Sequence, residues 1–513
     1  MKTNRISFYI CKFSYIISGI IFILMFFLCA VNKIVVTNNS GEYVNFYIHK
    51  YNYFFSAALI IALVLFLKHM LSNIKANMLF AIFSAVYIVV GIYLIVNVEP
   101  VLKADAAVVF DISRALNANN YSVFDLGGYL SRHPHQLGLS VYESLLLKIY
   151  DSVYTVYIAN LIHTLLINYF LMKITDILFD KNETVNKYVM IFSFLFLPQL
   201  LFVVFPYGHT AGLSFMLIAA YMLLKYLKSE KLHYILIAVI CSSISVLIRN
   251  NYMIFCLAII VMCIVHIINK RTTMPFIAII CMAFVILCSS GALKIYYENV
   301  KDVEIYSGEP KLLYIAMGLQ EGTRAPGWYT GYNDEVYTQT NYDSEESAKI
   351  AKEEILSKID NFVENPKYSV WFFYKKFVST WCDSTFQSVW SGPIDDNGDF
   401  VKTNLLKNLY SSGKSFYIYV SVCNIAVVNI LLFAAINSFC KFKRNIHYDD
   451  NCVNQLLPII YLIGGILFHI LWETKSQYVY TYIFFLIPLS ANGLYEAQLL
   501  FETKKRHCRI NKY

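Results

Sequence analysis

Charged residues are scarce in this chain of 513 residues. Asp, Glu, Lys and Arg make up 15% of it, whereas a typical soluble domain carries about 25%. Hydrophobic residues make up 58% and lie in long runs, which argues against a soluble domain with one buried core. The alternating ten-residue pattern of an outer-membrane barrel is absent, so α-helices are the structure expected to cross the membrane. The sequence predicts an all-α polytopic membrane protein.

Metal-binding and redox motifs are also missing. The chain contains twelve cysteines, but none forms a CxxC motif or a Cys/His spacing typical of zinc sites. Most of them lie within apolar runs or beside basic clusters, where cysteine serves as a small apolar residue. We therefore expect neither disulfides nor a cofactor. A divalent metal ion is compatible with the sequence, but no motif indicates one.

Twelve apolar runs predict about twelve transmembrane helices, since one span needs about 20 apolar residues. They lie near residues 13–31, 53–68, 77–96, 154–172, 188–206, 210–227, 233–249, 252–268, 273–291, 416–437, 455–471 and 478–496. Nine runs fall within an N-terminal transmembrane region, residues 1–291, and three within a C-terminal one, residues 416–513.

Lys and Arg cluster in alternate connections between these runs. If the chain crosses twelve times, all of these clusters fall on one side of the membrane. The positive-inside rule makes that side cytoplasmic, so we predict a multi-pass protein of the cell membrane with both termini in the cytoplasm. These clusters account for the net charge of +8, which therefore gives no reason to expect nucleic-acid binding.

Three longer segments then face the opposite side: residues 32–52, 97–153 and 292–415. The last is mildly acidic, and long loops are translocated regardless of their charge. Within it, residues 344–361 have helical spacing, and the aromatic-rich residues 368–377 resemble a helix lying in the membrane interface. We expect a partly helical extracytoplasmic region at 292–415 and a catalytic loop at 97–153.

The centres of the predicted spans contain almost no ionisable residues. Charged residues within a membrane usually mark ion or proton pathways, and coupled transporters usually combine them with broken helices. The sequence is expected to contain neither, which argues against a coupled transporter. Asn160, His163 and Asn168 share a polar stripe on one span, which favours hydrogen bonding between helices. The chemistry is therefore expected outside the membrane.

The first concentration of polar residues follows the third apolar run. Asp105 lies within a few residues of the membrane surface, and Asp111 follows six positions later in a helix predicted over residues 106–116. A six-residue offset places the two carboxylates on different helix faces, so a symmetric pair is not expected. An aspartate at this depth suits a general base that activates a hydroxyl. The alternative is a helix cap or a solvated loop residue.

Two short external turns carry the other basic candidates. Arg249 ends the seventh run and departs from the positive-inside trend; its planar fork suits a phosphate, and extension of the side chain to the interface is the alternative. Glu473 and Lys475 lie in the turn before the last run, where they suit a phosphate or sugar hydroxyls. The alternative is that this turn marks the interface together with its tyrosines.

Together these positions resemble the GT-C superfamily of integral membrane glycosyltransferases, particularly the bacterial branch related to protein O-mannosyltransferases and the aminoarabinose transferase of lipid A. Asp105 stands at the place of the acidic loop residue of that superfamily. Residues 128–138 are similar to a Tyr–Pro–His–Gln–Gly stretch of Gram-positive members, and residues 473–478 to their turn before the last span. Two departures are clear: the acidic loop follows the third run instead of the first, and no Asp-x-Asp motif is present.

The resemblance implies an inverting enzyme that moves a hexosyl or pentosyl group from a polyprenyl-phosphate donor. The acceptor would be an extracytoplasmic hydroxyl of a cell-wall polymer, a lipid or a protein, and no metal is obligatory. Asp105 would be the general base and Asp111 a second carboxylate, while Arg249 and Lys475 would bind the donor phosphate. Contacts to sugar or acceptor would come from Tyr129, His133, His135, Gln136, Glu473, Gln477 and Tyr478. The two histidines also suit a metal pair, but the sequence offers no third ligand nearby.

Two other functions are compatible with the sequence. A polysaccharide polymerase or ligase of the O-antigen type depends on external arginines and a histidine, for which Arg132 and His133 are candidates. A lipid or polysaccharide transporter without catalysis predicts a central hydrophilic cavity and internal pseudo-symmetry. The single dominant external loop argues against such symmetry.

Overall fold

The structure of the chain is a computed structural model that describes residues 5–36, 42–49, 53–270, 273–393, 400–443 and 450–510. Nearly all of this part of the chain is helical. Its one sheet is an antiparallel hairpin of β1 (Asn32–Val36) and β2 (Val44–Ile48). The predicted all-α class is therefore confirmed apart from this hairpin, which follows the first apolar helix.

Eight helices of the described chain are long and apolar enough to cross a bilayer. They are α1 (Arg5–Val31), α3 (Ala76–Asn97), α7 (Val153–Leu178), α10 (His209–Ser229), α12 (Met253–Lys270), α13 (Met274–Lys301), α19 (Lys414–Lys443) and α21 (Leu456–Leu471). Many of their apolar side chains face outward: Val89 of α3 is 68% exposed, and Leu287 of α13 is 78% exposed. A large apolar surface of this kind is favourable against lipid and unfavourable in water. The chain is a multi-pass membrane protein.

Two further apolar segments are helix pairs with a sharp bend. Pro198 lies at a bend of 52° and Pro488 at a bend of 50°. Proline lacks the amide donor, and its ring clashes with the preceding turn, so the helix breaks there. Unbroken helices were expected from the sequence and counted against a coupled transporter; these two bends show that this expectation is wrong. The elements involved are α8 (Glu183–Leu195), α9 (Pro198–Leu201), the 3₁₀ helix η4 (Phe202–Val204), α22 (Ser476–Phe484) and α23 (Ile487–Ile510).

The two remaining apolar runs form the shorter helices α2 (Ser56–Ser72) and α11 (Leu232–Ile248). Each of the twelve predicted runs is thus mostly helical, with internal breaks in the two bent segments. Within the membrane part, α19 packs against α1 on one side and α23 on another, and α10 packs against α7 and α11.

The longer connections contain short helices. Between α3 and α7 lie α4 (Ala104–Asn117), η2 (Ser122–Phe124), α5 (Tyr129–Arg132), η3 (Pro134–Gln136) and α6 (Leu137–Leu147). Between α13 and α19 lie α14 (Lys311–Gly318), α15 (Tyr332–Gln339), α16 (Ser344–Glu364), α17 (Pro366–Trp381) and α18 (Asn404–Tyr410). Three elements stand elsewhere: η1 (Tyr53–Phe55), η5 (Asn250–Tyr252) and α20 (Asp450–Asn454). The helices predicted over 106–116, 344–361 and 368–377 are confirmed as α4, α16 and α17.

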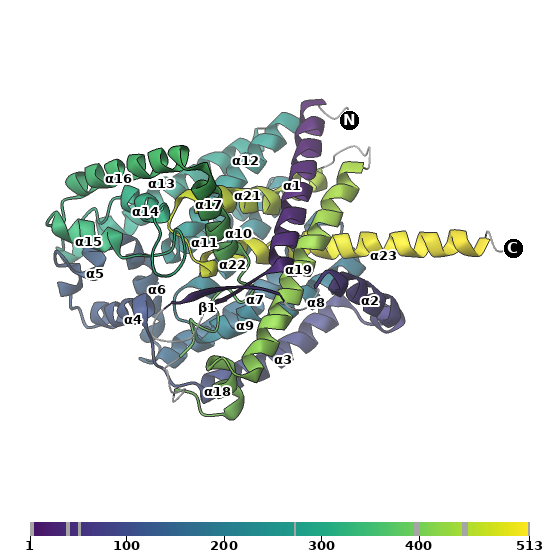
Figure 1. The fold of residues 1–513 in the computed structure, drawn as a ribbon, viewed down its shortest axis with the longest axis horizontal. Helices are drawn as coiled ribbons and strands as arrows, with labels where there is room; N and C mark the ends of the chain where they lie inside the picture. Colours follow the sequence, from purple (N-terminus) through teal and green to yellow (C-terminus); the bar gives the residue numbers. More distant parts are fainter. Residues whose placement is uncertain are drawn as a thin grey trace.

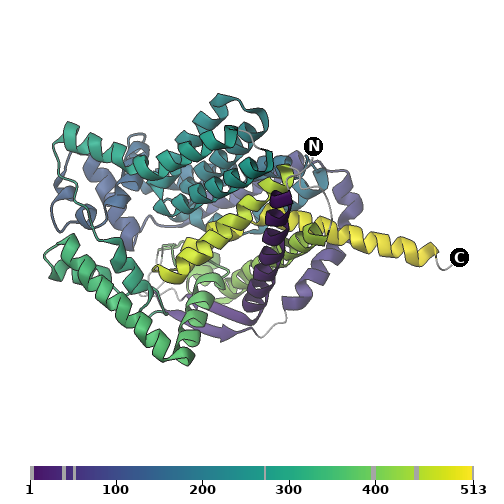
Figure 2. The same ribbon diagram turned by 90° about the horizontal axis from the view of Figure 1, so that it is seen from above.

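The short helices gather at one end of the molecule. Figure 1 shows α4, α5, α15 and α16 at the end opposite the C-terminal helix α23. In the perpendicular view of Figure 2, the green helices α16 and α17 run along one edge. The two long connections therefore share one end of the fold, where the candidate residues lie.

Two glycines allow these connections to approach the ends of apolar helices closely. A Cβ atom at Gly138 in α6 would lie 2.1 Å from the carbonyl oxygen of Leu247 in α11. One at Gly318 in α14 would lie 2.3 Å from the carbonyl oxygen of Leu471 in α21. Only glycine permits backbone contacts this close. They fix α6 next to Arg249 and α14 next to Glu473.

Lys376 of α17 strengthens the second contact. Its buried ammonium group donates hydrogen bonds to the carbonyl oxygens of Gly318, Ile470 and Trp472, at 2.5, 2.9 and 3.0 Å. The last turns of α14 and α21 leave carbonyl groups without helical partners, and a cation is favourable at such ends. Lys376 therefore ties three helices together beside the turn that carries Glu473 and Lys475.

Candidate functional site

Asp105 lies in the first turn of α4, shortly after α3 ends at Asn97. The preceding residue, Ala104, has a left-handed φ of 51°. Residues other than glycine adopt this conformation at a cost of roughly 1–3 kcal/mol, and such strain concentrates at functional sites. The Asp105 side chain is exposed, and its Oδ2 accepts a hydrogen bond from the Tyr207 hydroxyl at 3.2 Å.

Tyr207 joins Asp105 to two other predicted residues. Gln136 Nε2 donates to the Tyr207 hydroxyl at 2.8 Å, and Arg249 Nη1 donates to the Tyr207 carbonyl oxygen at 2.8 Å. The Arg249 guanidinium also lies 4.8 Å from the centre of the Tyr207 ring and 5.9 Å from that of Tyr478, within cation–π range. Burial and the charge of Asp105 raise the pKa of Tyr207, so its hydroxyl remains a proton donor.

Tyr129 and the two histidines continue this arrangement toward α5. Burial, with Tyr207 and Asp105 nearby, raises the pKa of Tyr129. The rings of Tyr129 and His133 lie 4.8 Å apart, and those of His133 and His135 lie 6.0 Å apart. Aromatic surface therefore extends from Asp105 to His133, which suits a sugar ring.

Basic side chains surround a buried carboxylate, Glu42, which follows β1. Lys475 Nζ lies 2.9 Å from Glu42 Oε1, and Arg324 Nε lies 3.1 Å from Glu42 Oε2. Glu42 is 3% exposed, so these are mostly desolvated ion pairs. Two cations against one anion leave a net positive charge at this place.

A third basic residue, Lys103, lies next to this group and two positions before Asp105. Burial lowers the pKa of Lys103 to about 8, and the charge of Glu42 opposes that shift. Lys103 and Lys475 both lie over the Trp390 ring, at 4.6 and 6.0 Å from its centre. An anion that approached Lys103 would stabilise its ammonium form further. We name Lys103, Arg324 and Lys475 the basic cluster.

Glu473 is a buried carboxyl near Asp105 and near Lys475 of the basic cluster. Burial raises its pKa to about 7; the charges of Glu42 and Asp105 act in the same direction, whereas Lys475 opposes them. Its Oε1 atom makes no hydrogen bond with the described residues. The Glu473 amide donates to the carbonyl oxygen of Tyr314 at 3.0 Å, so the long external connection is bonded directly to this turn.

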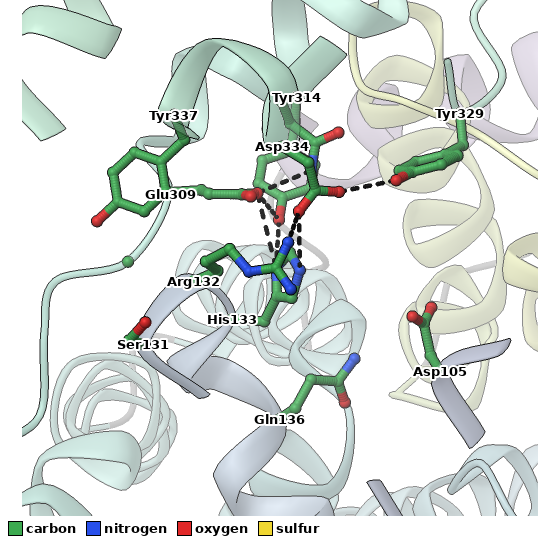
Figure 3. Close-up of polar contacts among 12 residues, drawn as sticks. Asp105, Ser131, Arg132, His133, Gln136, Glu309, Tyr314, Tyr329, Asp334 and Tyr337 are labelled. Carbon is green, nitrogen blue, oxygen red and sulfur yellow. Dashed lines mark hydrogen bonds and ion pairs between the residues drawn. The ribbon is translucent and has the colours of Figure 1, made fainter. Parts of the chain in front are cut away.

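A second polar group lies near Asp105. His133, Glu309 and Asp334 each place one polar atom within 4.8 Å of the other two. Figure 3 shows Arg132 and His133 directed toward Glu309 and Asp334, with Asp105 and Gln136 nearby. We name His133, Glu309 and Asp334 the His133 cluster.

Hydrogen bonds hold the members of the His133 cluster in place. Arg132 forms an ion pair with Asp334, whose Oδ2 accepts from the Tyr329 hydroxyl at 2.7 Å. The Tyr314 hydroxyl donates to Glu309 Oε2 at 2.7 Å and lies 3.1 Å from His133 Nδ1. Burial, with a smaller effect of Asp334, raises the pKa of Glu309 to about 7, and burial lowers that of His133.

The site is built at the ends of apolar helices. Asp105 follows α3, Tyr207 joins η4 to α10, Arg249 joins α11 to η5, and Lys475 joins α21 to α22. Because these residues and their immediate neighbours are in contact, all of these helix ends lie on one face of the molecule. They are the connections without Lys and Arg clusters, which the sequence predicts to lie together on the side opposite to those clusters.

Most predicted site residues meet here. Asp105, Tyr129, His133, His135, Gln136, Arg249, Glu473, Lys475 and Tyr478 are linked by the contacts above. Gln477 is buried, and its backbone amide nitrogen lies 3.5 Å from Gln387 Oε1, at the limit of a hydrogen bond. Asp111 is exposed on α4 and makes no hydrogen bond or ion pair with other described residues.

Sequence reasoning missed several residues of this arrangement. Lys103 stands in the segment singled out for Asp105, and its proximity to that residue was a usable signal. No local sequence pattern marks Tyr207, Glu42 or Arg324, because their partners are distant in the chain. Glu309 and Asp334 supply the carboxylates that the sequence could not place near His133.

Comparisons with known proteins find no relative of this chain: no protein-family model, no curated protein and no solved structure matches it.

Proposed function

We propose that this chain is an integral membrane glycosyltransferase of the GT-C type, which transfers a sugar from a polyprenyl-phosphate donor to an extracytoplasmic hydroxyl group. The observation that carries the proposal is one exposed carboxylate, Asp105, which is linked through Tyr207 to Arg249 and follows Lys103 of the basic cluster by two positions. A lipid-linked phosphate lies at this depth, because its tail is in the bilayer.

The topology that accompanies this proposal has twelve spans. Eight single helices, two bent pairs and two shorter apolar helices give that number if each crosses once. The Lys and Arg clusters then face the cytoplasm, and the site faces the extracytoplasmic side of the cell membrane.

Asp105 would act as the general base. Its carboxylate accepts the proton of the acceptor hydroxyl as the oxygen attacks the anomeric carbon, and the bond from that carbon to the phosphate oxygen breaks on the opposite face. This displacement inverts the configuration. The leaving polyprenyl phosphate is already an anion, so it needs cationic stabilisation and no general acid, in contrast to the leaving group of a glycosidase.

The basic cluster would bind the donor phosphate. Lys475 and Arg324 carry two positive charges against the single charge of Glu42, and Lys103 adds a third. Phosphate recognition by charge-assisted hydrogen bonds requires such an excess. Arg249 would stabilise negative charge on the Tyr207 side of Asp105.

The remaining candidates would contact the sugar or the acceptor. Tyr129 and Tyr478 offer aromatic faces, Gln136 offers an amide next to Asp105, and Glu473 offers a buried carboxyl. His133, His135 and Gln477 complete this set. A carboxyl with a pKa near 7 exchanges a proton easily at neutral pH, which suits a hydrogen bond to a sugar hydroxyl.

The test is transfer from radiolabelled polyprenyl-phosphate sugars in proteoliposomes, with envelope extract as acceptor. We expect transfer by the wild type and loss of transfer in Asp105→Asn. Asp125, an exposed residue of the same loop, gives the matched control Asp125→Asn. Asp111→Asn tests the second carboxylate. Equal transfer by the wild type and Asp105→Asn would remove Asp105 from the mechanism.

A transporter is the second candidate, and the two bent helix pairs favour it, since broken helices are common in transporters. The same proteoliposomes distinguish the two functions. A transporter moves the lipid-linked sugar to the opposite leaflet and leaves its glycosyl bond intact, whereas the transferase breaks that bond.

A further inference from the structure

The His133 cluster joins two parts of the chain that are far apart in sequence. His133 follows α5 in the 97–153 loop, whereas Glu309 precedes α14 and Asp334 lies in α15. The two parts also touch through their backbones, since the Glu309 amide donates to the carbonyl oxygen of Arg132 at 2.9 Å. The cluster is therefore a junction that holds the long external connection against the loop of Asp105.

The spacing of the cluster approaches that of ligands around one ion, since one ligand atom of each residue lies within 4.8 Å of the other two. His133 Nδ1 lies 3.6 Å from Glu309 Oε2, and His133 Nε2 lies 3.8 Å from Asp334 Oδ1; only one of these two nitrogens can bind the shared ion. Nitrogen and oxygen ligands at roughly 2.0–2.2 Å from a tetrahedral ion are separated by about 3.3–3.6 Å. A small movement of these side chains would bring one atom of each to a shared cation.

Unpaired buried acceptors supply an independent indication of a cation. Glu309 Oε1 and Asn333 Oδ1 are buried and make no hydrogen bond with the described residues. The Asn333 amide nitrogen donates to Glu309 Oε2 at 2.8 Å, so both unpaired oxygens belong to groups at the cluster. Unpaired buried acceptors are unfavourable, and a bound cation is one partner that removes this cost.

The negative charge at this junction also favours a bound cation. Glu309 and Asp334 carry two carboxylates, and Arg132 pairs with Asp334 alone. Within the described chain, the ion pairs of Glu309 involve only His133. A carboxylate oxygen has two lone pairs, so Asp334 Oδ1 can retain Arg132 and bind a cation as well.

We propose that His133, Glu309 and Asp334 bind a divalent transition-metal cation, Zn²⁺ or Mn²⁺, which fastens the long external connection to the Asp105 loop. Carboxylates bind most divalent cations, whereas an imidazole ligand favours transition metals over Mg²⁺ and Ca²⁺. This binding does not depend on the proposed sugar transfer, because it needs neither donor nor acceptor.

The experiment measures metal content in the full chain, purified in detergent. The protein is stripped with a chelator, equilibrated with Zn²⁺ or Mn²⁺, freed of unbound metal and analysed by elemental mass spectrometry. We expect about one equivalent bound and a rise in the unfolding temperature, whereas Mg²⁺ has no such effect. Mn²⁺ electron paramagnetic resonance would add a coupling from the His133 nitrogen.

Variants assign the ion to its ligands. Glu309→Gln and Asp334→Asn should each bind less than a tenth of the wild-type metal and lose the metal-dependent rise in unfolding temperature. Glu335→Gln, an exposed neighbour of Asp334 in α15, is the control that should bind normally. Size-exclusion chromatography identifies any variant that fails to fold. In that case, the metal content of the other ligand variant tests the proposal. Absence of bound metal in the wild type, or equal binding in all variants, would overturn the proposal and leave a hydrogen-bonded network.

Discussion

The basic cluster and the His133 cluster both contact Tyr329, but their charges are opposite in sign. Around Glu42, three basic residues stand against one buried carboxylate, so positive charge is in excess. Around His133, two carboxylates stand against one arginine, so negative charge is in excess. Burial makes both imbalances costly, since a desolvated charge needs a partner. Two neighbouring groups of opposite excess charge therefore favour different ligands, an anion on one side and a cation on the other.

Apart from the loss of Asp105 itself, the largest effect is expected at the basic cluster. Lys475→Met removes one cation that would stabilise the donor phosphate, and loss of such a group typically costs about 10²-fold or more in rate. Transfer in proteoliposomes should fall by about that factor. Lys367→Met, on the exposed surface of α17, should transfer at the wild-type rate. If both variants behave alike, the excess positive charge has no role in donor binding.

The next effect concerns Glu473 and pH. Its pKa is about 7 in the folded protein, against an ordinary value of 4.5. The folded state therefore binds more protons between these pH values, and stability falls as the pH rises through this window. Glu473→Gln cannot lose a proton, so at pH 8 it should exceed the wild type in stability by about 1–3 kcal/mol.

Thermal unfolding followed by tryptophan fluorescence at pH 8 and near pH 4.5 checks whether Glu473→Gln is the more stable protein. The advantage of Glu473→Gln should shrink toward the lower pH. The exposed Glu353→Gln in α16 is the control and should unfold like the wild type throughout. A Glu473→Gln variant less stable than the wild type at pH 8 would contradict a buried carboxyl without a full partner.

A smaller effect is expected at Tyr207. Tyr207→Phe removes the hydroxyl that donates to Asp105 and accepts from Gln136. A hydrogen bond to a charged group contributes roughly 1.5–3 kcal/mol, and the exposure of Asp105 reduces this. We expect kcat to fall by about tenfold with little change in KM, measured in the transfer assay. A change in KM alone would assign Tyr207 to binding instead of to orientation of the base.

The smallest effect is expected at Ala104. Its φ of 51° suits glycine better than alanine. Ala104→Gly should therefore raise the unfolding temperature slightly, by the equivalent of up to about 1 kcal/mol, and lower transfer a few-fold because Asp105 is held less firmly. Reduced stability in this variant would show that the backbone at Ala104 is not strained.

Local patterns made the helices predictable from the sequence. All twelve apolar runs are mostly helical, and α4, α16 and α17 were expected from their spacing. The bends at Pro198 and Pro488 were also readable, because proline in an apolar run predicts a break. The β1–β2 hairpin was not predicted, since the short segment of residues 32–52 offers little alternation.

Contacts between residues far apart in the chain could not be predicted from the sequence. The contact of Lys475 with Glu42 spans 433 positions, and that of Arg132 with Asp334 spans 202. Nothing local to either residue specifies its partner, because helix packing brings them together. Candidates at helix ends such as Asp105 and Arg249 were predictable, whereas the groups that balance their charges were not.

Donor binding and transfer, measured separately for Asp105→Asn, test the central claim most directly. Under the proposed function, binding of a radiolabelled polyprenyl-phosphate sugar would depend on the basic cluster, whereas transfer would depend also on the base. We predict that Asp105→Asn binds the donor within about threefold of the wild type and transfers at less than about a hundredth of its rate. Transfer by Asp105→Asn at the wild-type rate would contradict the account.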